Sequence, residues 1–382
     1  VGDHSWWVAS KELQAAHALE SPEEGSRAFP EGGYYVSRMG DPARPDVLVW
    51  DCGPFGYSAN RKHAHADALS VVLAVRGVTM LYDPGVGGFR DIAPGQESSP
   101  IADLVREWRR LRTTRAHNTV RVDGEDQGIM ADRYEIWDPP EPRTLLWSTA
   151  VDFDVMWGRH LGYARLADPV THDRLIIASR HGYWIVLDLL SGQGIHSVET
   201  RYNFAPGSEL RRGPSGARFI AEREGVRLEL ALFGPENFTS QIDLGDDVLL
   251  GELKDGEPER IRSVSGFCRA SLPIAFGIVL TDPSRNITLR MCQPQIPHYR
   301  LELDLNDHID RVLVRLGALS TADGRRGPTS PIVVIERFAR DGKLVGAWQT
   351  GGDRGAGRGL DPTLIGNGGL AVSGRASGRT EE

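Results

Sequence analysis

Three histidines and two aspartates at short spacings carry the densest ligand chemistry of the chain. His63, His65 and Asp67 alternate with alanines in the segment HAHAD, and Asp83 precedes a Pro-Gly turn. His117 follows in the segment RAHNTV. Neutral imidazole nitrogens and ionised carboxylates are ligands that zinc accepts. His65, Asp83 and His117 are therefore predicted to form a three-ligand zinc site, with His63 left free beside it.

Strands are the elements predicted to bring these side chains together. Residues 63–76 are rich in β-branched side chains, which predicts a strand with both histidines and the first carboxylate on one face. Residues 78–83 predict a return strand, and residues 117–122 a third strand. The ends of three strands would then meet at one point. An alternative stays open, because an HxH pair can be a solvated polar face and an Asp before Pro-Gly is often only a turn residue.

The composition excludes several classes of protein. The chain has 382 residues, 40% of them hydrophobic and 25% charged, which is typical of a globular protein with a large core. Its net charge of -8 argues against a general nucleic-acid binder. No apolar run reaches the roughly 18 to 20 residues that a membrane-spanning helix needs. The three cysteines, Cys52, Cys268 and Cys292, are predicted to be small buried side chains, although one disulfide remains open.

Most of the chain after residue 33 consists of short β-rich runs separated by Gly, Pro and Asp. Such strands, without long helices between them, predict an all-β fold built as a large antiparallel β-sandwich. Residues 5–19 and 100–115 differ, because their apolar residues recur at helical spacing. The second segment has a cationic face that is either solvated or binds the carboxylates and sulfates of an anionic substrate. Its arginines are Arg106, Arg109, Arg110, Arg112 and Arg115.

Composition divides the chain into three parts. Residues 1–25 are interpreted as the end of a helical domain or a linker, because a lone amphipathic helix cannot bury its own apolar face. Residues 26–349 are predicted to form the β-sandwich domain. Residues 350–382 are rich in glycine and are predicted to be a flexible tail.

Four segments resemble, in order, the C-terminal domain of the heparinase II/III family of polysaccharide lyases, which has relatives acting on alginate. They are FPEGGYYVSR at 29–38, HAHADALS at 63–70, YDPG at 82–85 and RAHNTVRVDG at 115–124. The resemblance implies an α/α toroid domain followed by a large antiparallel β-sandwich, with the substrate cleft between them. The N-terminal residues would then be the remnant of the last toroid helix, and an N-terminal toroid domain is expected in the full-length protein.

The resemblance also implies roles for single residues. In relatives, zinc is held by the second histidine of HxH, the aspartate of DPG and the histidine of HN, which here are His65, Asp83 and His117. This zinc is expected to be structural. The first histidine of HxH faces the cleft and takes part in proton transfer, which gives His63 the catalytic role.

The reaction implied is β-elimination on an anionic, uronic-acid-containing polysaccharide of the heparan or alginate type. The enzyme must neutralise the C5 carboxylate, remove the C5 proton and protonate the departing glycosidic oxygen. The residues predicted to bind substrate are Asn118, Arg115, Arg90 and His196. A periplasmic or secreted location is expected.

The sequence departs from the family at the catalytic tyrosine. Relatives commonly carry tyrosines shortly after the DPG motif, whereas this chain has Phe89 there, with Tyr57 or Tyr82 as possible substitutes. Asn203 also stands where relatives often have a histidine. A second hypothesis is therefore a non-catalytic carbohydrate-binding or structural module with a structural zinc. A third is a zinc hydrolase, because three protein ligands and an open position also describe catalytic zinc.

Overall fold

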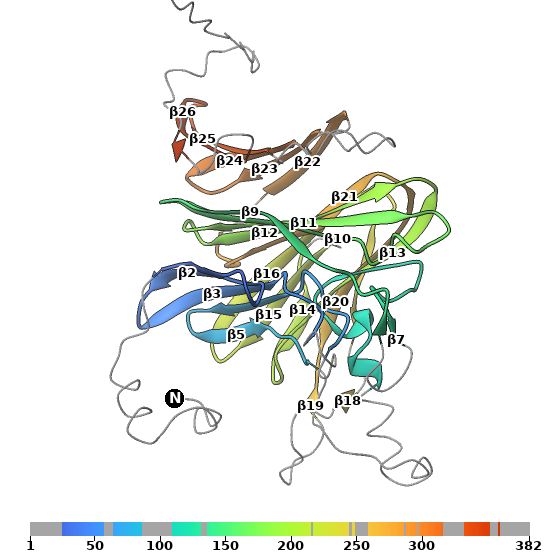
Figure 1. The fold of residues 1–382 in the computed structure, drawn as a ribbon. Coiled ribbons are helices and arrows are strands. Elements are labelled where there is room, and N and C mark those ends of the chain that lie inside the picture. The colour runs from blue at the N-terminus through green and yellow to red at the C-terminus, as the bar shows by residue number, and fades with distance from the viewer. Residues whose placement is uncertain are drawn as a thin grey trace, which may run out of the picture.

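Three layers of antiparallel β-sheet make up most of the computed structural model (Figure 1). This confirms the predicted all-β, antiparallel class. The structure describes residues 25–56, 64–85, 109–130, 136–214, 217–243, 247–248, 259–285, 288–295, 298–315, 332–351 and 358–359. The helix predicted for residues 5–19 lies outside these ranges, as does most of the predicted tail. No helix in the described ranges is long and apolar enough to cross a membrane.

The first layer is a five-stranded sheet in which each strand pairs with the next one along the chain, in the order β1-β2-β3-β4-β5. Its strands are β1 Arg27–Phe29, β2 Tyr34–Asp41, β3 Arg44–Asp51, β4 Val71–Val75 and β5 Val78–Leu81. Buried and partly buried residues alternate along β4. This alternation is typical of a sheet that packs one face on a core.

The central layer is an eight-stranded sheet in the order β14-β15-β16-β21-β12-β11-β10-β9. Its strands are β9 Arg143–Thr149, β10 Phe153–His160, β11 Val170–Ser179, β12 Tyr183–Gly192, β14 Glu209–Arg212, β15 Arg218–Arg223, β16 Val226–Phe233 and β21 Ile274–Thr281. Nine of the ten residues of β12 are buried. A strand covered on both faces accounts for this near-continuous apolar run.

The third layer is a six-stranded sheet in the order β22-β23-β24-β25-β26-β27. Its strands are β22 Thr288–Gln295, β23 His298–Asp304, β24 His308–Arg315, β25 Ile332–Ala339, β26 Leu344–Gly351 and β27 Arg358–Gly359. The predicted sandwich gave no number of sheets, and the structure has this third layer. The central sheet therefore buries apolar residues on both faces.

Alternate residues of β11 and β12 belong to two different cores. Ile176 and Trp184 pack in the core shared with the five-stranded sheet, which includes Trp50. Leu175 and Ile185 pack in the core shared with the six-stranded sheet. Because side chains alternate between faces along a strand, residues with even numbers on these two strands face the first layer.

A four-stranded sheet, in the order β17-β20-β13-β6, adjoins these layers. Its strands are β6 Val120–Val122, β13 Ile195–Asn203, β17 Thr239–Asp243 and β20 Ser263–Ser271. Two short hairpins complete the described strands: β7 Ile129–Met130 with β8 Ile136–Trp137, and β18 Asp247–Val248 with β19 Glu259–Arg260. A 3-10 turn, η2 Thr114–Ala116, leads directly into His117.

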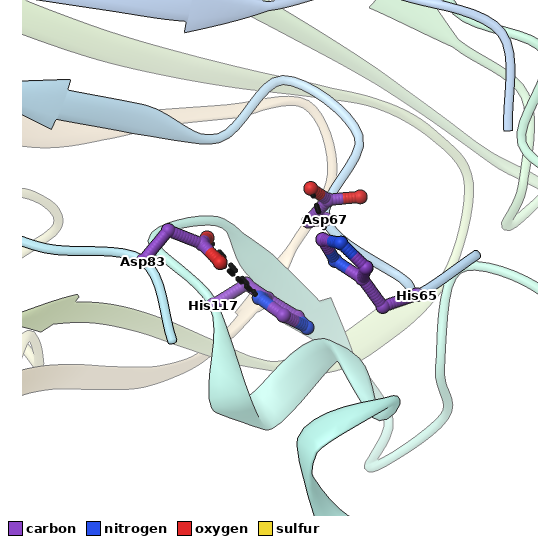
Figure 2. A group of neighbouring side chains, drawn as sticks. All are labelled: His65, Asp67, Asp83 and His117. Atoms are coloured by element: carbon purple, nitrogen blue, oxygen red, sulfur yellow. Dashed lines mark hydrogen bonds and ion pairs between the residues drawn. The ribbon is translucent and has the colours of Figure 1, made fainter. Parts of the chain in front are cut away.

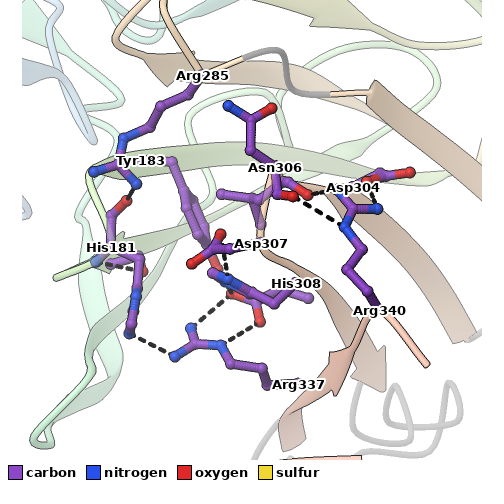
Figure 3. A network of polar contacts seen from close by, with 12 residues as sticks. His181, Tyr183, Arg285, Asp304, Asn306, Asp307, His308, Arg337 and Arg340 are labelled. Carbon is purple, nitrogen blue, oxygen red and sulfur yellow. Dashed lines mark hydrogen bonds and ion pairs between the residues drawn. The ribbon is translucent and has the colours of Figure 1, made fainter. Parts of the chain in front are cut away.

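Polar contacts also join the third layer to the central sheet (Figure 3). The Tyr183 hydroxyl donates to Asp310 Oδ2 at 2.7 Å. Arg337 donates to both oxygens of the same carboxylate, at 2.7 and 2.8 Å. Asp310 is fully buried, so this network satisfies a charge that would otherwise be costly inside the protein.

Candidate metal centre

Four side chains from three separate segments meet beside the five-stranded sheet (Figure 2). They are His65, Asp67, Asp83 and His117, and one donor atom from each lies within 4.8 Å of the others. The structure thus brings together the three predicted zinc ligands and adds Asp67, for which the sequence offered no ligand role. Two imidazoles and two carboxylates match the donors that zinc prefers, and four protein donors match a closed structural site.

The segment that carries His65 is a loop and not the predicted strand. Residues 64–70 are turns and bends, and β4 begins only at Val71. The Asp67 amide donates to the carbonyl of His65 at 3.0 Å, and Leu69 has a positive φ of 64°. The prediction failed because most of this backbone bonds within the loop, to Arg112 or to buried side chains, and only the Ser70 carbonyl accepts from a neighbouring strand, at Asp51. Gln127, for example, accepts from the Ala68 amide at 2.9 Å and donates to its carbonyl at 3.0 Å.

His117 has a fixed tautomer that suits a metal ligand. Its Nε2 lies 2.8 Å from the carbonyl oxygen of Leu111, so this nitrogen carries a hydrogen and donates it. Its Nδ1 faces both oxygens of Asp83, at 2.9 and 3.1 Å (Figure 2). A ring-nitrogen lone pair and a carboxylate oxygen repel each other at this distance. A proton or a metal ion must therefore lie between them. A backbone carbonyl behind the ring is the usual partner of a metal-bound histidine.

His65 offers a buried nitrogen without a hydrogen bond. Its Nδ1 lies 3.1 Å from Asp67 Oδ2, which is ion-pair distance, but the geometry does not satisfy a hydrogen bond. The His65 ring stacks on the His117 ring, with centroids 4.6 Å apart. A buried polar atom that lacks a partner calls for a further ligand, so the residues present fit a metal ion.

The surrounding carboxylates make the centre strongly negative. Burial opposes the charge on His65, but Asp67, followed by Asp83 and Asp51, outweighs it and raises the pKa of His65 to about 9. Burial would likewise raise the pKa of Asp83, but the facing His117 imidazole holds it well below its usual range. Burial and the nearby charge of Asp67 raise the pKa of Asp51 to about 7. A bound cation would relieve this mutual repulsion.

Buried side chains fix the segments that carry the donors. The Ser70 hydroxyl donates to Asp83 Oδ2 at 3.0 Å. The Asn118 amide nitrogen donates to the carbonyls of Val71 at 2.8 Å and Tyr82 at 3.0 Å, while its oxygen accepts from the Asn203 amide at 2.6 Å. Asn118 therefore ties together the ends of β4, β5 and β13. The prediction that it binds substrate remains a prediction, and these contacts give it a structural role.

Asn203 has a defined place in this framework. Its side-chain nitrogen donates to the Ala116 carbonyl at 2.7 Å, and its own carbonyl accepts from the Tyr82 amide at 3.0 Å. It thus holds the turn before His117 against the residue before Asp83. This role could not be predicted from the sequence, because the partners of Asn203 lie far away along the chain.

The other predicted site residues lie in different settings. Arg115 is more than half exposed and lies 3.5 Å from Glu199, so it is accessible to a polyanion. His196 is buried, with Nδ1 2.7 Å from Asp123 and Nε2 2.9 Å from the Gln193 carbonyl. Arg112, expected on a cationic face, is instead buried and donates to the Ala64 carbonyl at 3.2 Å.

Several predicted residues lie outside the described ranges. These are His63, Arg90, Tyr57 and Phe89. Tyr82 is described, and its ring packs on the small apolar cluster of Leu111, Ala116 and Ile261. The assignments of His63 and Arg90 to catalysis and substrate binding remain predictions.

Comparison with known proteins identifies the family. Residues 21–267 match the profile described as "Heparinase II/III-like, C-terminal", which covers well over half of the chain and includes every donor of the metal centre. The chain belongs to the heparinase II/III-like C-terminal family. The matched region includes the five-stranded sheet and ends before the six-stranded sheet begins.

Known relatives of this family share both sequence and fold with the chain. A heparin-sulfate lyase of Bacteroides stercoris is 23% identical over 225 residues, which is 59% of this chain and 30% of that protein. A heparinase III, the BT4657 gene product, superposes with a TM-score of 0.60 at 17% identity, covering 77% of this chain and 43% of that one. Heparan sulfate lyase HepC from Pedobacter heparinus gives a TM-score of 0.58 at 18% identity, with the same two coverages. The chain thus spans less than half the length of these relatives.

Proposed function

We propose that this chain is the metal-bearing β-domain of a polysaccharide lyase that cleaves a uronic-acid polymer by β-elimination. The observation that carries the proposal is the meeting of His65, Asp83 and His117 at one point in a member of the heparinase II/III-like family. A heparan-type polymer is the first substrate to test, because the matched relatives are named as heparin- and heparan-sulfate lyases. Alginate is the second.

The metal is proposed to be zinc, held by His65, Asp83 and His117, with Asp67 completing the set. Bound there, zinc would offset the charge of the two carboxylates and hold three chain segments together. The closed set of four donors supports a structural role for it. Loss of zinc would then act on catalysis through the shape of the segment 64–70.

The protein's own residues would carry the proton transfers. His63 is proposed to abstract the C5 proton, since it is the first histidine of the HxH motif, two residues before His65 in the sequence. An imidazole with an ordinary pKa suits a base at neutral pH. Arg115, which is exposed, would contact the anionic polymer. The acid that protonates the leaving oxygen is proposed to come from a helical domain that completes the cleft in the full-length protein, which we expect to be periplasmic or secreted.

The alternative function is a carbohydrate-binding or structural module with the same zinc. Two observations favour it over catalysis by this chain alone. Of the described residues that were predicted to bind substrate, Asn118 and His196 are buried with their polar atoms engaged. The chain also covers only 30% of the matched curated lyase.

The test is lyase activity of the full-length gene product and of this chain on heparan sulfate, heparin and alginate. The expected product is a conjugated unsaturated uronate, detected by its ultraviolet absorbance. His63→Ala should remove activity while zinc content stays at that of the wild type, and Arg337→Lys, on the far side of the central sheet, should keep activity. Zinc-loaded full-length protein that binds these polymers but yields no unsaturated product from any of them would favour the alternative.

A further inference from the structure

A buried ion pair lies in the central sheet on the side of the metal centre. Arg174 of β11 and Asp188 of β12 are directly opposite in register, and both are fully buried. Arg174 donates from Nε to Asp188 Oδ1 at 2.7 Å and from Nη2 to Oδ2 at 2.9 Å. Taking two charges out of water is costly, and well-packed apolar residues often stabilise a fold equally well. The pair therefore calls for a role beyond filling the core.

The remaining nitrogen of Arg174 leaves the pair and reaches the metal centre. Its Nη1 donates to the carbonyl of Leu69 at 2.8 Å and to the carbonyl of Asn118 at 2.6 Å. Leu69 precedes Ser70, which donates to Asp83, and Asn118 follows His117. One guanidinium nitrogen thus connects the loop that carries His65 and Asp67 to the turn that carries His117.

The loop needs such a restraint because its backbone is strained. Leu69 is a bulky residue with a φ of 64°, a conformation that L-residues with large side chains rarely adopt. Its carbonyl is held by Arg174, and the neighbouring Ala68 is bracketed on both polar atoms by Gln127. Without these contacts, the loop would relax toward ordinary extended backbone, and the His65 and Asp67 side chains would move with it.

Two histidines hold the far end of the same pair. The Gly162 amide donates to His160 Nδ1 at 3.1 Å, so the hydrogen of this ring sits on Nε2 and is donated to His172 Nδ1 at 2.8 Å. His172 in turn donates from Nε2 to Asp188 Oδ1 at 2.7 Å. These contacts form one chain from Gly162 through His160 and His172 to Asp188, which supports Asp188 and, through it, Arg174.

We propose that Arg174 is a positioning residue for the metal centre, whose Nη1 sets the separation between the His65 loop and His117. The proposal rests on the proposed metal site and adds a residue to it that touches no metal ligand itself. Only arginine can serve, because a lysine has one nitrogen and cannot span a carboxylate and two carbonyls together.

The experiment compares Arg174→Lys with Arg337→Lys. Arg337 of β25 makes the same two-pronged contact with the buried Asp310 of β24, but in the six-stranded sheet, which covers the face of the central sheet away from the metal centre. Both variants keep the positive charge and remove two hydrogen bonds of similar length from a guanidinium to one carboxylate. Only Arg174→Lys also loses the contacts with the carbonyls of Leu69 and Asn118.

The measurements are the zinc dissociation constant, by competition with a chromophoric chelator, and the visible spectrum of the Co²⁺-substituted protein. Arg174→Lys is expected to weaken zinc binding by roughly 10-fold, the low end of the effect of losing a group bonded to a ligand, because Arg174 acts through the backbone, and to change the Co²⁺ bands. Arg337→Lys is expected to leave both unchanged. Circular dichroism at the measurement temperature checks that each variant is folded.

Equal zinc affinities in the two variants would overturn the role of Arg174 and leave the metal site standing. Failure of the wild type to bind zinc would overturn the metal site and the inference with it. If Arg174→Lys does not fold, Asp188→Asn takes its place, because it keeps the size of the partner while it loosens Arg174. Unchanged zinc affinity in that variant would count against the proposal in the same way.

Discussion

Two buried arginine–aspartate pairs lie in different sheets and serve different neighbours. Arg174–Asp188 is in the central sheet and Arg337–Asp310 is in the six-stranded sheet. Arg174–Asp188 faces the five-stranded sheet, and its spare nitrogen binds carbonyls beside the metal centre. Arg337–Asp310 lies within the six-stranded sheet, and Asp310 accepts from Tyr183 of the central sheet. The Arg337 guanidinium lies against the rings of Phe153 and Trp348 and against His181. Similar ion-pair geometry thus lies beside the candidate metal centre in one sheet and at a sheet interface in the other.

This difference indicates that the groups in contact with a buried ion pair, and not the pair itself, decide its role. At the interface, the Arg337 charge is balanced by one carboxylate, and the remaining contacts are aromatic, so the pair joins two layers. At the centre, the Arg174 contacts end on backbone that carries ligands. Three predictions test this contrast.

The largest expected effect follows from breaking the interface pair. Arg337→Ala leaves Asp310 buried without its cation, which should lower the free energy of unfolding by about 3 to 5 kcal/mol. Zinc affinity should stay at the wild-type value, because no contact of Arg337 reaches the donors. Urea unfolding and a zinc titration measure the two quantities. A parallel loss of zinc affinity would mean that the two faces are coupled and that the contrast between them is wrong.

Removing zinc should lower the stability of the folded protein only when the metal centre is intact. With free zinc at a hundredfold excess over its dissociation constant, binding adds about 2.7 kcal/mol to the stability of the folded state. A chelator should therefore lower the melting temperature of the wild type and of Arg337→Lys. His117→Ala, which loses a donor, should melt at the same temperature with and without chelator. A full zinc-dependent shift in that variant would show that the ion binds elsewhere.

The smallest expected effect concerns acid stability at the interface. Burial opposes the charge on Asp310, but hydrogen bonds from Arg337 and His308 outweigh it and lower the pKa of Asp310 to about 2. A lowered carboxyl pKa stabilises the fold above the ordinary value near 3.8, and this stability is lost as the pH falls toward 2. The loss should be about 1 kcal/mol by pH 3 and about 2 kcal/mol by pH 2.

Asp310→Asn is the control for this pH dependence. It cannot titrate, so its unfolding free energy should fall less steeply between pH 5 and pH 2 than that of the wild type, by about 2 kcal/mol. Identical slopes would show that Asp310 has an ordinary pKa in the folded protein. The pKa of Asp188 is lowered too, through Arg174 and His172 against the effect of burial, so Asp188→Asn should change the slope in the same direction.

The sequence was sufficient to predict the types of side chain that could bind a metal ion and the class of the fold. Imidazoles at His65 and His117 and a carboxylate at Asp83 predicted a metal site from chemistry that needs no tertiary information. The β-branched runs predicted an antiparallel all-β protein, because alternation along a strand is a local property. The buried state of Cys52 and Cys268 was also predicted correctly.

The conformation of residues 64–70 could not be predicted from the local sequence. Nor could the roles of the distant side chains that bond to its backbone. The alternation in HAHAD favours a strand, yet the segment is a loop because Gln127 and Arg174 satisfy its backbone. The sequence also did not indicate how many sheets pack together, since a run of apolar residues in β12 does not reveal what covers its second face.

By itself, the sequence determined which atoms can bind a cation, because ligand chemistry belongs to each side chain wherever it lies. Only the tertiary structure decided that Asp67 joins the other three donors and that Arg174, 105 residues after Leu69, holds the loop in place. The physical reason is that a strained loop is stable only when distant buried groups hold it. Those contacts form only after the sheets have packed together.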